Sequence, residues 1–330
     1  MRYECRGLLA GISGLILSGL ATSAFAEAPA KPTPPALRAA TVCTVVPSSA
    51  TYDATIAVAS NFYGPAQDLL TSFTSSGKPG AGYHFRVCHN ATGDLDAEIR
   101  TGTSGYSLFL AADTATPHDL VGTPYVQSGA TDFLYANGIP VLFARYATVS
   151  DVQTLMPSVS SGVSATLSAK MTGATALSTT NSQTIAVANL DSAPYGEAAY
   201  YIMRDMGLWS ATHPENIPSS VSNPLYDNIA LTFQSVANSP YTNKSGFVSK
   251  AQICSGISSS PPTYIYIAFT YNGTVSPPTD AYLRKQSGIL IASGNSTQNS
   301  WGVAIKNYML SNSDPTYWPT FLNTHCYAPI

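Results

Sequence analysis

Charged side chains are scarce in this sequence: Lys, Arg, Asp and Glu together make up 10% of its 330 residues, whereas an average soluble domain has about 25%. The formal net charge at pH 7 is -3. The sequence therefore lacks the basic character of nucleic-acid-binding proteins, and nucleic acid is not an expected partner. With so few ionic groups, we expect a binding site built from hydroxyl, amide and backbone N–H donors.

Signatures of common catalytic sites are also missing. There is no Gly-x-Ser-x-Gly elbow, no HExxH pair and no P-loop, since Pro79 follows Gly77-Lys78 where a P-loop needs Ser or Thr. Cys88-His89 lacks the CxxC or HxxxH partner of a metal site. We therefore expect that the protein is not an enzyme and that it holds no metal and no cofactor.

The N-terminus has the features of a secretory signal peptide, predicted over residues 1–26. Arg2 and Arg6 precede an apolar run that is short for a membrane span, and Ala24-Phe25-Ala26 fits the small-x-small cleavage rule. The alternative is an uncleaved anchor. Residues 27–42 are rich in proline and predict an extended linker. We expect a periplasmic or secreted protein.

Cysteine is rare, and its count is informative. Cys5 lies within the predicted signal peptide, which leaves Cys43, Cys88, Cys254 and Cys326. An even number of cysteines in an exported chain predicts two disulfides, and four cysteines allow three pairings.

The first half of the chain alternates between strand-like and helix-like segments. Strands are predicted over 55–60, 83–88 and 106–111, and helices over 66–73 and 94–100. This β-α-β-α-β order implies a parallel sheet with right-handed crossovers.

A second series follows with the same logic. It has predicted strands at 133–135, 139–144, 184–189, 246–248 and 263–271, and predicted helices at 197–206, 229–236 and 301–308. Two such series predict an α/β protein with two lobes, each a mostly parallel sheet flanked by helices.

Four short segments place small or polar residues at the start of a helix-like run. They are Ala59-Ser60-Asn61-Phe62, Asn90-Ala91-Thr92-Gly93, Ala193-Pro194-Tyr195-Gly196 and Asp227-Asn228-Ile229-Ala230. Helix N-termini carry unpaired N–H groups and a partial positive charge. Several such ends directed at one point would form an anion site without Lys or Arg. Each segment taken alone is more typical of a helix cap.

These segments, in this order, resemble those of periplasmic molybdate-binding proteins of ABC importers, which are type II periplasmic solute-binding proteins. The resemblance covers roughly residues 55–325. It is carried by Ile56–Pro65, Asn90–Gly93, Tyr106–Asp113, Val187–Gly196 with its Ala-Pro-Tyr-Gly turn, Asn228–Val236 and Gly246–Gln252.

The resemblance implies a type II periplasmic-binding-protein fold. Lobe I would comprise residues 43–136 and 262–330, and lobe II residues 137–261. The family layout also favours the pairings Cys43–Cys88 and Cys254–Cys326, because each pair would then lie near one part of the fold.

Ligand-binding roles are implied for six residues. Ser60 and Asn61 would donate from the first turn, and Thr92 would donate through its hydroxyl and N–H. Tyr195 and Ile229 would offer backbone N–H groups from the other lobe. Ser249 occupies the position of a tyrosine that contacts the ligand in some family members.

The implied function is capture of molybdate or tungstate as an oxyanion, without metal–ligand bonds, by a monomer that delivers it to ABC permease subunits. A fully deprotonated oxyanion only accepts hydrogen bonds, so donors alone suit it. The same fold binding sulfate, phosphate or a small organic anion is the alternative. A secreted adhesion or structural protein and a hydrolase are more remote alternatives.

Overall fold

The computed structural model describes residues 39–145, 164–166, 185–205, 209–210, 212–219, 221–238, 243, 245–260, 262–270, 283–310, 314–328 and 330. The predicted signal peptide and most of the predicted linker lie outside these residues. None of the helices in the described part of the chain combines the length and apolar character needed to cross a membrane.

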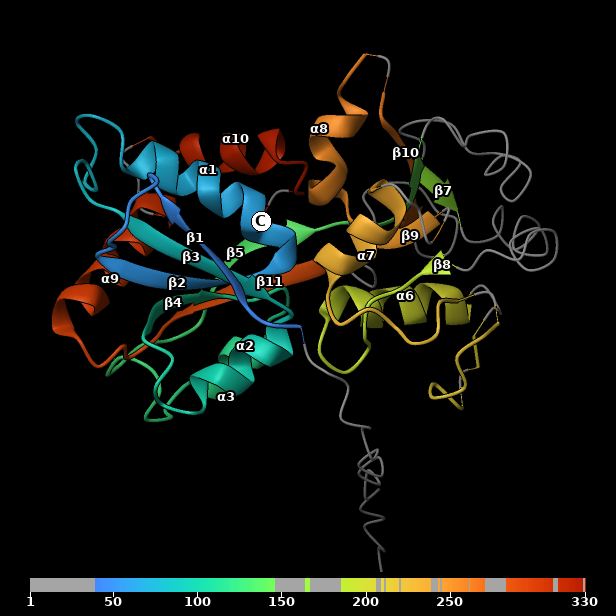
Figure 1. The fold of residues 1–330 in the computed structure, drawn as a ribbon, viewed down its shortest axis with the longest axis horizontal. Helices are drawn as coiled ribbons and strands as arrows, with labels where there is room; N and C mark the ends of the chain where they lie inside the picture. The colour runs from blue at the N-terminus through green and yellow to red at the C-terminus, as the bar shows by residue number, and fades with distance from the viewer. Residues whose placement is uncertain are drawn as a thin grey trace, which may run out of the picture. The chain divides into compact units, whose positions relative to one another are not determined.

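A six-stranded sheet forms the first lobe (Figure 1), with the strand order β1-β3-β2-β4-β11-β5. Its strands are β1 (Val42–Val46), β2 (Ala54–Ala59), β3 (Phe85–Asn90), β4 (Tyr106–Leu110), β5 (Phe133–Gly138) and β11 (Arg284–Leu290). Its helices are η1 (Ser60–Phe62), α1 (Tyr63–Phe73), α2 (Thr92–Ile99), α3 (Ala115–Leu120), α9 (Ser296–Leu310) and α10 (Tyr317–Thr324).

Strand β2 shows why this sheet has two covered faces. All six of its residues are buried, and Ile56 and Val58 pack in a core that includes α1, α9 and α10. Ala57 points to the opposite face and packs with Leu95 of α2. A strand covered on both sides reads as a continuous apolar run rather than an alternating one.

A five-stranded sheet forms the second lobe, with the order β7-β10-β6-β9-β8. Its strands are β6 (Pro140–Arg145), β7 (Ser164–Thr166), β8 (Ile185–Ala186), β9 (Ser245–Ser249) and β10 (Tyr264–Thr270). Its helices are α6 (Pro194–Asp205), α7 (Ile229–Ala237), η3 (Lys250–Ile253) and α8 (Cys254–Ile257). Leu142 packs with α6 on one face, whereas Val141 and Phe143 pack with α7 on the other.

The sheets are mixed rather than mostly parallel. Strand β2 runs parallel to β3 and β4, as predicted from the first series. The strands that bring the chain into a sheet from the other lobe run antiparallel to their neighbours: β6 against β9 and β10, and β11 against β4 and β5. Residues near β6 and β11 in the sequence do not indicate that these strands run antiparallel to their neighbours.

The predicted lobe boundary at residue 262 is also wrong. Strand β10 pairs with β6 in the second sheet, so the described chain rejoins the first sheet only at β11. The β-prone composition of 263–271 predicts a strand correctly, but composition does not specify the sheet in which a strand pairs. The strands β1, β7 and β11 and the helices α3, α8 and α10 were not predicted.

Both predicted disulfides are present. Cys43 and Cys88 lie directly opposite each other on β1 and β3. Cys254, at the start of α8, is bonded to Cys326, which follows α10. Because Ile253 packs in the core of the second lobe and Tyr327 in that of the first, the Cys254–Cys326 bond joins the two lobes.

Candidate functional site

Four helix N-termini meet at one small cavity of about 10 Å³, roughly the room that one water molecule needs. The residues that line it are Ala59, Ser60, Asn61, Asn90, Ala91, Thr92, Ala112, Ala193, Pro194, Tyr195 and Ile229. Except for Ala112, which follows β4, they come from the starts of η1 and α2 in the first lobe and of α6 and α7 in the second. Five of the six residues predicted to bind ligand are among them; Ser249 is not.

The two first-lobe turns meet because of the sheet register. Strands β2 and β3 are parallel neighbours, and their last residues, Ala59 and Asn90, are paired. Ser60 begins η1 directly after Ala59, and Thr92 begins α2 two residues after Asn90. The carboxyl ends of parallel strands form the ligand-binding edge of open α/β sheets, so both turns lie at that edge.

Thr92 is suited to donate into the cavity. Its Oγ1 accepts a hydrogen bond from the N–H of Ala112 at 3.0 Å, which leaves the hydroxyl hydrogen for another acceptor. Thr92 is also the first residue of α2, where a backbone N–H has no acceptor within the helix. One residue therefore offers two donors.

Asn61 has a different arrangement. Its Nδ2 donates to Gln286 Oε1 at 3.1 Å and to the hydroxyl of Tyr327 at 3.0 Å. Its Oδ1 is buried and has no hydrogen-bond partner among the described residues. The side-chain amide hydrogens are thus held by the protein interior, and the N–H at the start of η1 remains as a donor of this residue.

Gln286 is a buried residue that the sequence reasoning missed. Its Oε1 also lies 2.8 Å from the hydroxyl of Tyr135, and its Nε2 donates to the hydroxyl of Tyr195 at 2.9 Å. Burial raises the pKa of the Tyr195 hydroxyl, which therefore stays protonated. This strand residue of the first lobe holds the tyrosine of the second, and no sequence motif marks it.

The start of α6 explains the Ala-Pro-Tyr-Gly turn. Pro194 is the first residue of the helix, a position where proline's missing N–H costs no hydrogen bond. A Cβ added at Gly196 would lie 2.3 Å from the carbonyl oxygen of Ala188. Only glycine allows α6 to begin so close to the preceding chain, and this approach places the N–H of Tyr195 at the helix mouth.

The start of α7 is fixed by Asn228. Its Oδ1 accepts from the N–H of Leu231 at 3.0 Å and caps the helix. Its Nδ2 donates to Oδ1 of Asn90 in the first lobe at 3.1 Å. Ile229 is therefore the first helical residue, and its N–H has no acceptor within the helix.

The lobes are in direct contact around the cavity. Besides the Asn228–Asn90 and Gln286–Tyr195 bonds, the N–H of Gly93 donates to the carbonyl of Ser192 at 2.9 Å. Arg284 on β11 also pairs with Glu197 on α6 at 3.1 Å. This arrangement, called the closed arrangement below, lets donors from both lobes reach one point.

The lining residues carry no formal charge. Asp94 and Asp227, which flank two of the turns, are not among them. A cavity at four helix N-termini, without carboxylates, has a positive potential from backbone dipoles alone. Its electrostatics favour a bound anion. Among the described residues, no group of His, Cys, Asp and Glu side chains is arranged to hold a metal ion.

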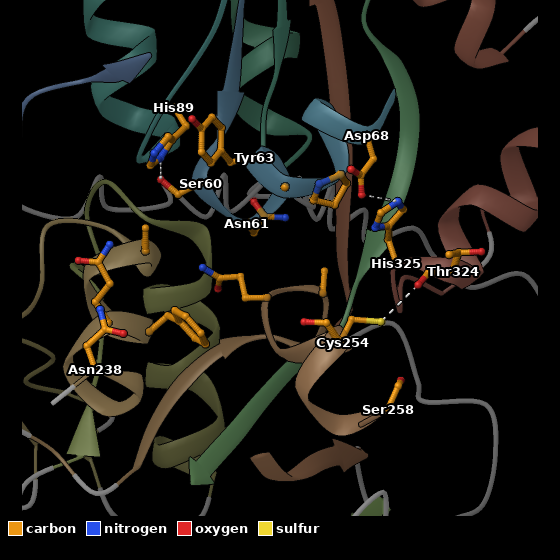
Figure 2. Close-up of a pocket in the computed structure, with 18 residues that line it drawn as sticks. Ser60, Asn61, Tyr63, Asp68, His89, Asn238, Cys254, Ser258, Thr324 and His325 are labelled. Atoms are coloured by element: carbon orange, nitrogen blue, oxygen red, sulfur yellow. Dashed lines mark hydrogen bonds and ion pairs between the residues drawn. The ribbon is translucent and has the colours of Figure 1, made fainter. Parts of the chain in front are cut away.

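A larger groove of about 670 Å³ adjoins the cavity and shares Ser60 and Asn61 with it. We call it the outer groove (Figure 2). His89, Tyr63 and Asp68 line it from the first lobe, and Phe233 and Gln252 from the second. Ser249 instead caps η3, where its Oγ accepts from the N–H of Ala251 at 3.3 Å.

Comparison with known proteins agrees with this geometry. The molybdate-binding protein ModA of Rhodobacter capsulatus is 27% identical over 198 residues, which are 60% of this chain and 64% of that protein. This chain thus spans less than two thirds of that relative's length. The periplasmic molybdate-binding protein of Azotobacter vinelandii has a similar fold, with a TM-score of 0.60 at 18% identity over 84% of this chain and 99% of that one.

The sulfate-binding protein SubI of Mycobacterium tuberculosis has a TM-score of 0.55 at 8% identity, over 85% of this chain and 87% of that one. At such low identities the structural matches bear on the fold alone. The family model for bacterial extracellular solute-binding proteins matches residues 54–285, which contain all four donor turns. The chain belongs to the family of bacterial extracellular solute-binding proteins.

Proposed function

We propose that this protein captures a tetrahedral oxyanion, molybdate or tungstate, between the lobes at the four helix N-termini and delivers it to an ABC permease from the periplasm. The observation that carries the proposal is the meeting of four helix N-termini, two from each lobe, at a cavity without charged side chains. The likeness to a relative named as a molybdate-binding protein supports the choice of anion.

The donor set suits an anion that carries no hydrogen. Thr92 offers a hydroxyl and an N–H, and Tyr195 and Ile229 offer N–H groups from the second lobe. A hydrogen bond to a charged partner contributes about 1.5–3 kcal/mol. Association itself costs on the order of 4–15 kcal/mol. Several such bonds are therefore required, and they form together only when both lobes contribute.

Isothermal titration calorimetry with molybdate, tungstate, sulfate and phosphate tests the proposal. We expect heat and the tightest binding with molybdate or tungstate. The double variant Ser60→Ala/Thr92→Val, which removes both lining hydroxyls, should bind far more weakly, whereas Thr71→Val, on the exposed side of α1, serves as the control. An absence of heat with all four anions would reject the oxyanion site. Undiminished affinity in the double variant would place the site elsewhere.

One observation favours a second candidate, a protonated anion such as hydrogen phosphate. Oδ1 of Asn61 is a buried acceptor without a partner in the described residues, and a P–OH group could donate to it. The same titrations separate the candidates, because this alternative expects phosphate to bind more tightly than molybdate. It also expects Asn61→Ala alone to weaken phosphate more than sulfate.

A further inference from the structure

His89 stands beside the anion cavity without lining it. It lies on β3 next to the disulfide-bonded Cys88, and its half-buried ring faces the outer groove. Its Nδ1 is 3.0 Å from Oγ of Ser60, and its ring is 4.0 Å from that of Tyr63, measured between centroids. Figure 2 shows the three side chains gathered on one side of the groove.

Ser60 lines both the groove and the cavity, and its hydroxyl has a single hydrogen. If His89 carries its proton on Nε2, then Nδ1 accepts the hydrogen of the Ser60 hydroxyl, and Ser60 has only lone pairs to present to an anion. If Nδ1 is protonated, it donates to Oγ, and the Ser60 hydrogen is available to the anion. The imidazolium form always has this second arrangement.

We propose that His89 is a positioning residue that makes Ser60 a donor to the bound anion and that couples anion binding to the uptake of a proton. The proposal rests on the proposed function, since it concerns the same cavity. It assigns pH sensitivity to a site whose lining residues cannot themselves change charge near neutral pH.

The ionisable groups near His89 lie on the strands and helices that pack against β3. The elements packed against β3 are β1, β2, α1 and α2. The ionisable side chains on these elements and on β3 itself, besides His89 and the disulfide cysteines, are Arg86, Tyr63, Asp68, Asp94, Asp96 and Glu98. Helix α7, which lines the groove from the second lobe, contains none.

Four of these groups have identified partners. Asp68 faces His325 at 3.6 Å, and Asp96 pairs with Arg100 at 2.8 Å. Glu98 accepts from the hydroxyls of Tyr106 and Thr41. Arg86 donates to Thr55 Oγ1 at 3.1 Å. Among the described residues, the hydrogen bond and ring contact found for His89 are to Ser60 and Tyr63, so an anion in the cavity would supply a negative charge that its proton could complement.

The direction of the coupling follows from burial. Burial lowers the pKa of His89, so the empty protein holds the neutral ring near pH 7. A dianion next to Ser60 favours the cation and raises this pKa on binding. The complex therefore binds more protons than the free protein between the two pKa values, and the affinity increases as the pH falls through that interval. The limit is tenfold per pH unit for one proton.

Calorimetric titration with molybdate at pH 6, 7 and 8, in two buffers of different ionisation enthalpy, measures both affinity and proton uptake. We expect the wild type to take up a fraction of a proton and to bind several-fold more tightly at pH 6 than at pH 8. His89→Asn keeps an amide that can donate to Ser60 but cannot titrate. It should bind with an affinity independent of pH and without proton uptake.

His89→Leu neither accepts the Ser60 hydrogen nor titrates, so Ser60 is free to donate to the anion, and this variant should also bind with an affinity independent of pH and without proton uptake. His84→Asn is the matched control. His84 precedes the same strand, with Nδ1 3.0 Å from the carbonyl oxygen of Pro47, and this variant should follow the wild-type profile.

The outcomes separate this proposal from the proposed function. If the wild type binds molybdate but His89→Asn keeps the wild-type pH dependence and proton uptake, the role of His89 is overturned while the site stands. A pH dependence or proton uptake that persists in His89→Leu would have the same meaning. If the wild type binds none of the four anions, the proposed function fails and this proposal fails with it.

Discussion

The two lobes surround the cavity with different kinds of donor. The first lobe contributes a hydroxyl from Thr92, poised by Ala112, together with the helix starts of η1 and α2. The second contributes backbone N–H groups, because the hydroxyl of Tyr195 lies against Gln286 on β11 and Ile229 has an apolar side chain. The hydroxyl donor of Thr92 can thus be removed by changing one atom, whereas the donors of the second lobe depend on the geometry of two helix starts.

The largest effect is expected where the lobes touch. Gly93 donates its N–H to Ser192, and a Cβ at residue 93 would lie 3.1 Å from the Cα of Ser192. Gly93→Leu should therefore hold the lobes apart and remove both second-lobe donors. A loss of two bonds of about 1.5–3 kcal/mol each weakens molybdate binding by more than about 100-fold.

Calorimetry on the wild type, Gly93→Ala and Gly93→Leu measures the effect. We expect the affinity of the alanine variant for molybdate to lie between those of the wild type and the leucine variant. Small-angle X-ray scattering with saturating molybdate would report whether the leucine variant still compacts. Wild-type affinity in Gly93→Leu would mean that the closed arrangement is not the form that binds.

A smaller effect is expected from the side-chain donor of the first lobe. Thr92→Val should lower the affinity for molybdate about 10- to 100-fold, since it removes one charge-assisted bond. It also leaves the N–H of Ala112 without its acceptor, so thermal stability should fall. Thr92→Ser restores the hydroxyl and should recover most of both losses. Failure of serine to recover the affinity would assign the loss to packing rather than to the donor.

In the second lobe, loss of a hydroxyl should lower the stability of the protein more than its affinity for the anion. Tyr195→Phe keeps the backbone N–H but deprives the buried Nε2 of Gln286 of its acceptor. We expect urea unfolding to show a loss of about 1–3 kcal/mol, with a smaller drop in affinity than in Thr92→Val. Tyr83→Phe, at an exposed tyrosine, is the control. A larger affinity loss in Tyr195→Phe than in Thr92→Val would contradict the assignment of backbone donors to this lobe.

The strand–helix corners of the site could be predicted from the sequence because each has a local signal. An apolar run ends, a small or polar residue follows, and helical spacing begins, as at Ser60 and Thr92. Parallel neighbours then end at one edge, which explains why separate segments meet. The resemblance to a known family supplied the pairing of the cysteines and the order of the turns.

Features that depend on distant partners could not be predicted. Gln286 becomes important only because β11 inserts between β4 and β5, and no residue near it in sequence indicates this. The placement of β10 in the second sheet has the same cause. Ser249 matched a family position, yet its hydroxyl serves as the cap of η3. Sequence position alone does not tell a capping hydroxyl from one that faces a ligand.

The Cys254–Cys326 bond has a mechanical consequence for any separation of the lobes. The chain also crosses between the lobes at Ile139, whose carbonyl accepts from the N–H of Lys250 at 2.8 Å. The chain crosses again between β10 of the second sheet and β11 of the first, so the disulfide is a third link between the lobes. Links at separate places oppose sliding and twisting and favour a hinge rotation, which would bring the same donors back to the same place at each closure.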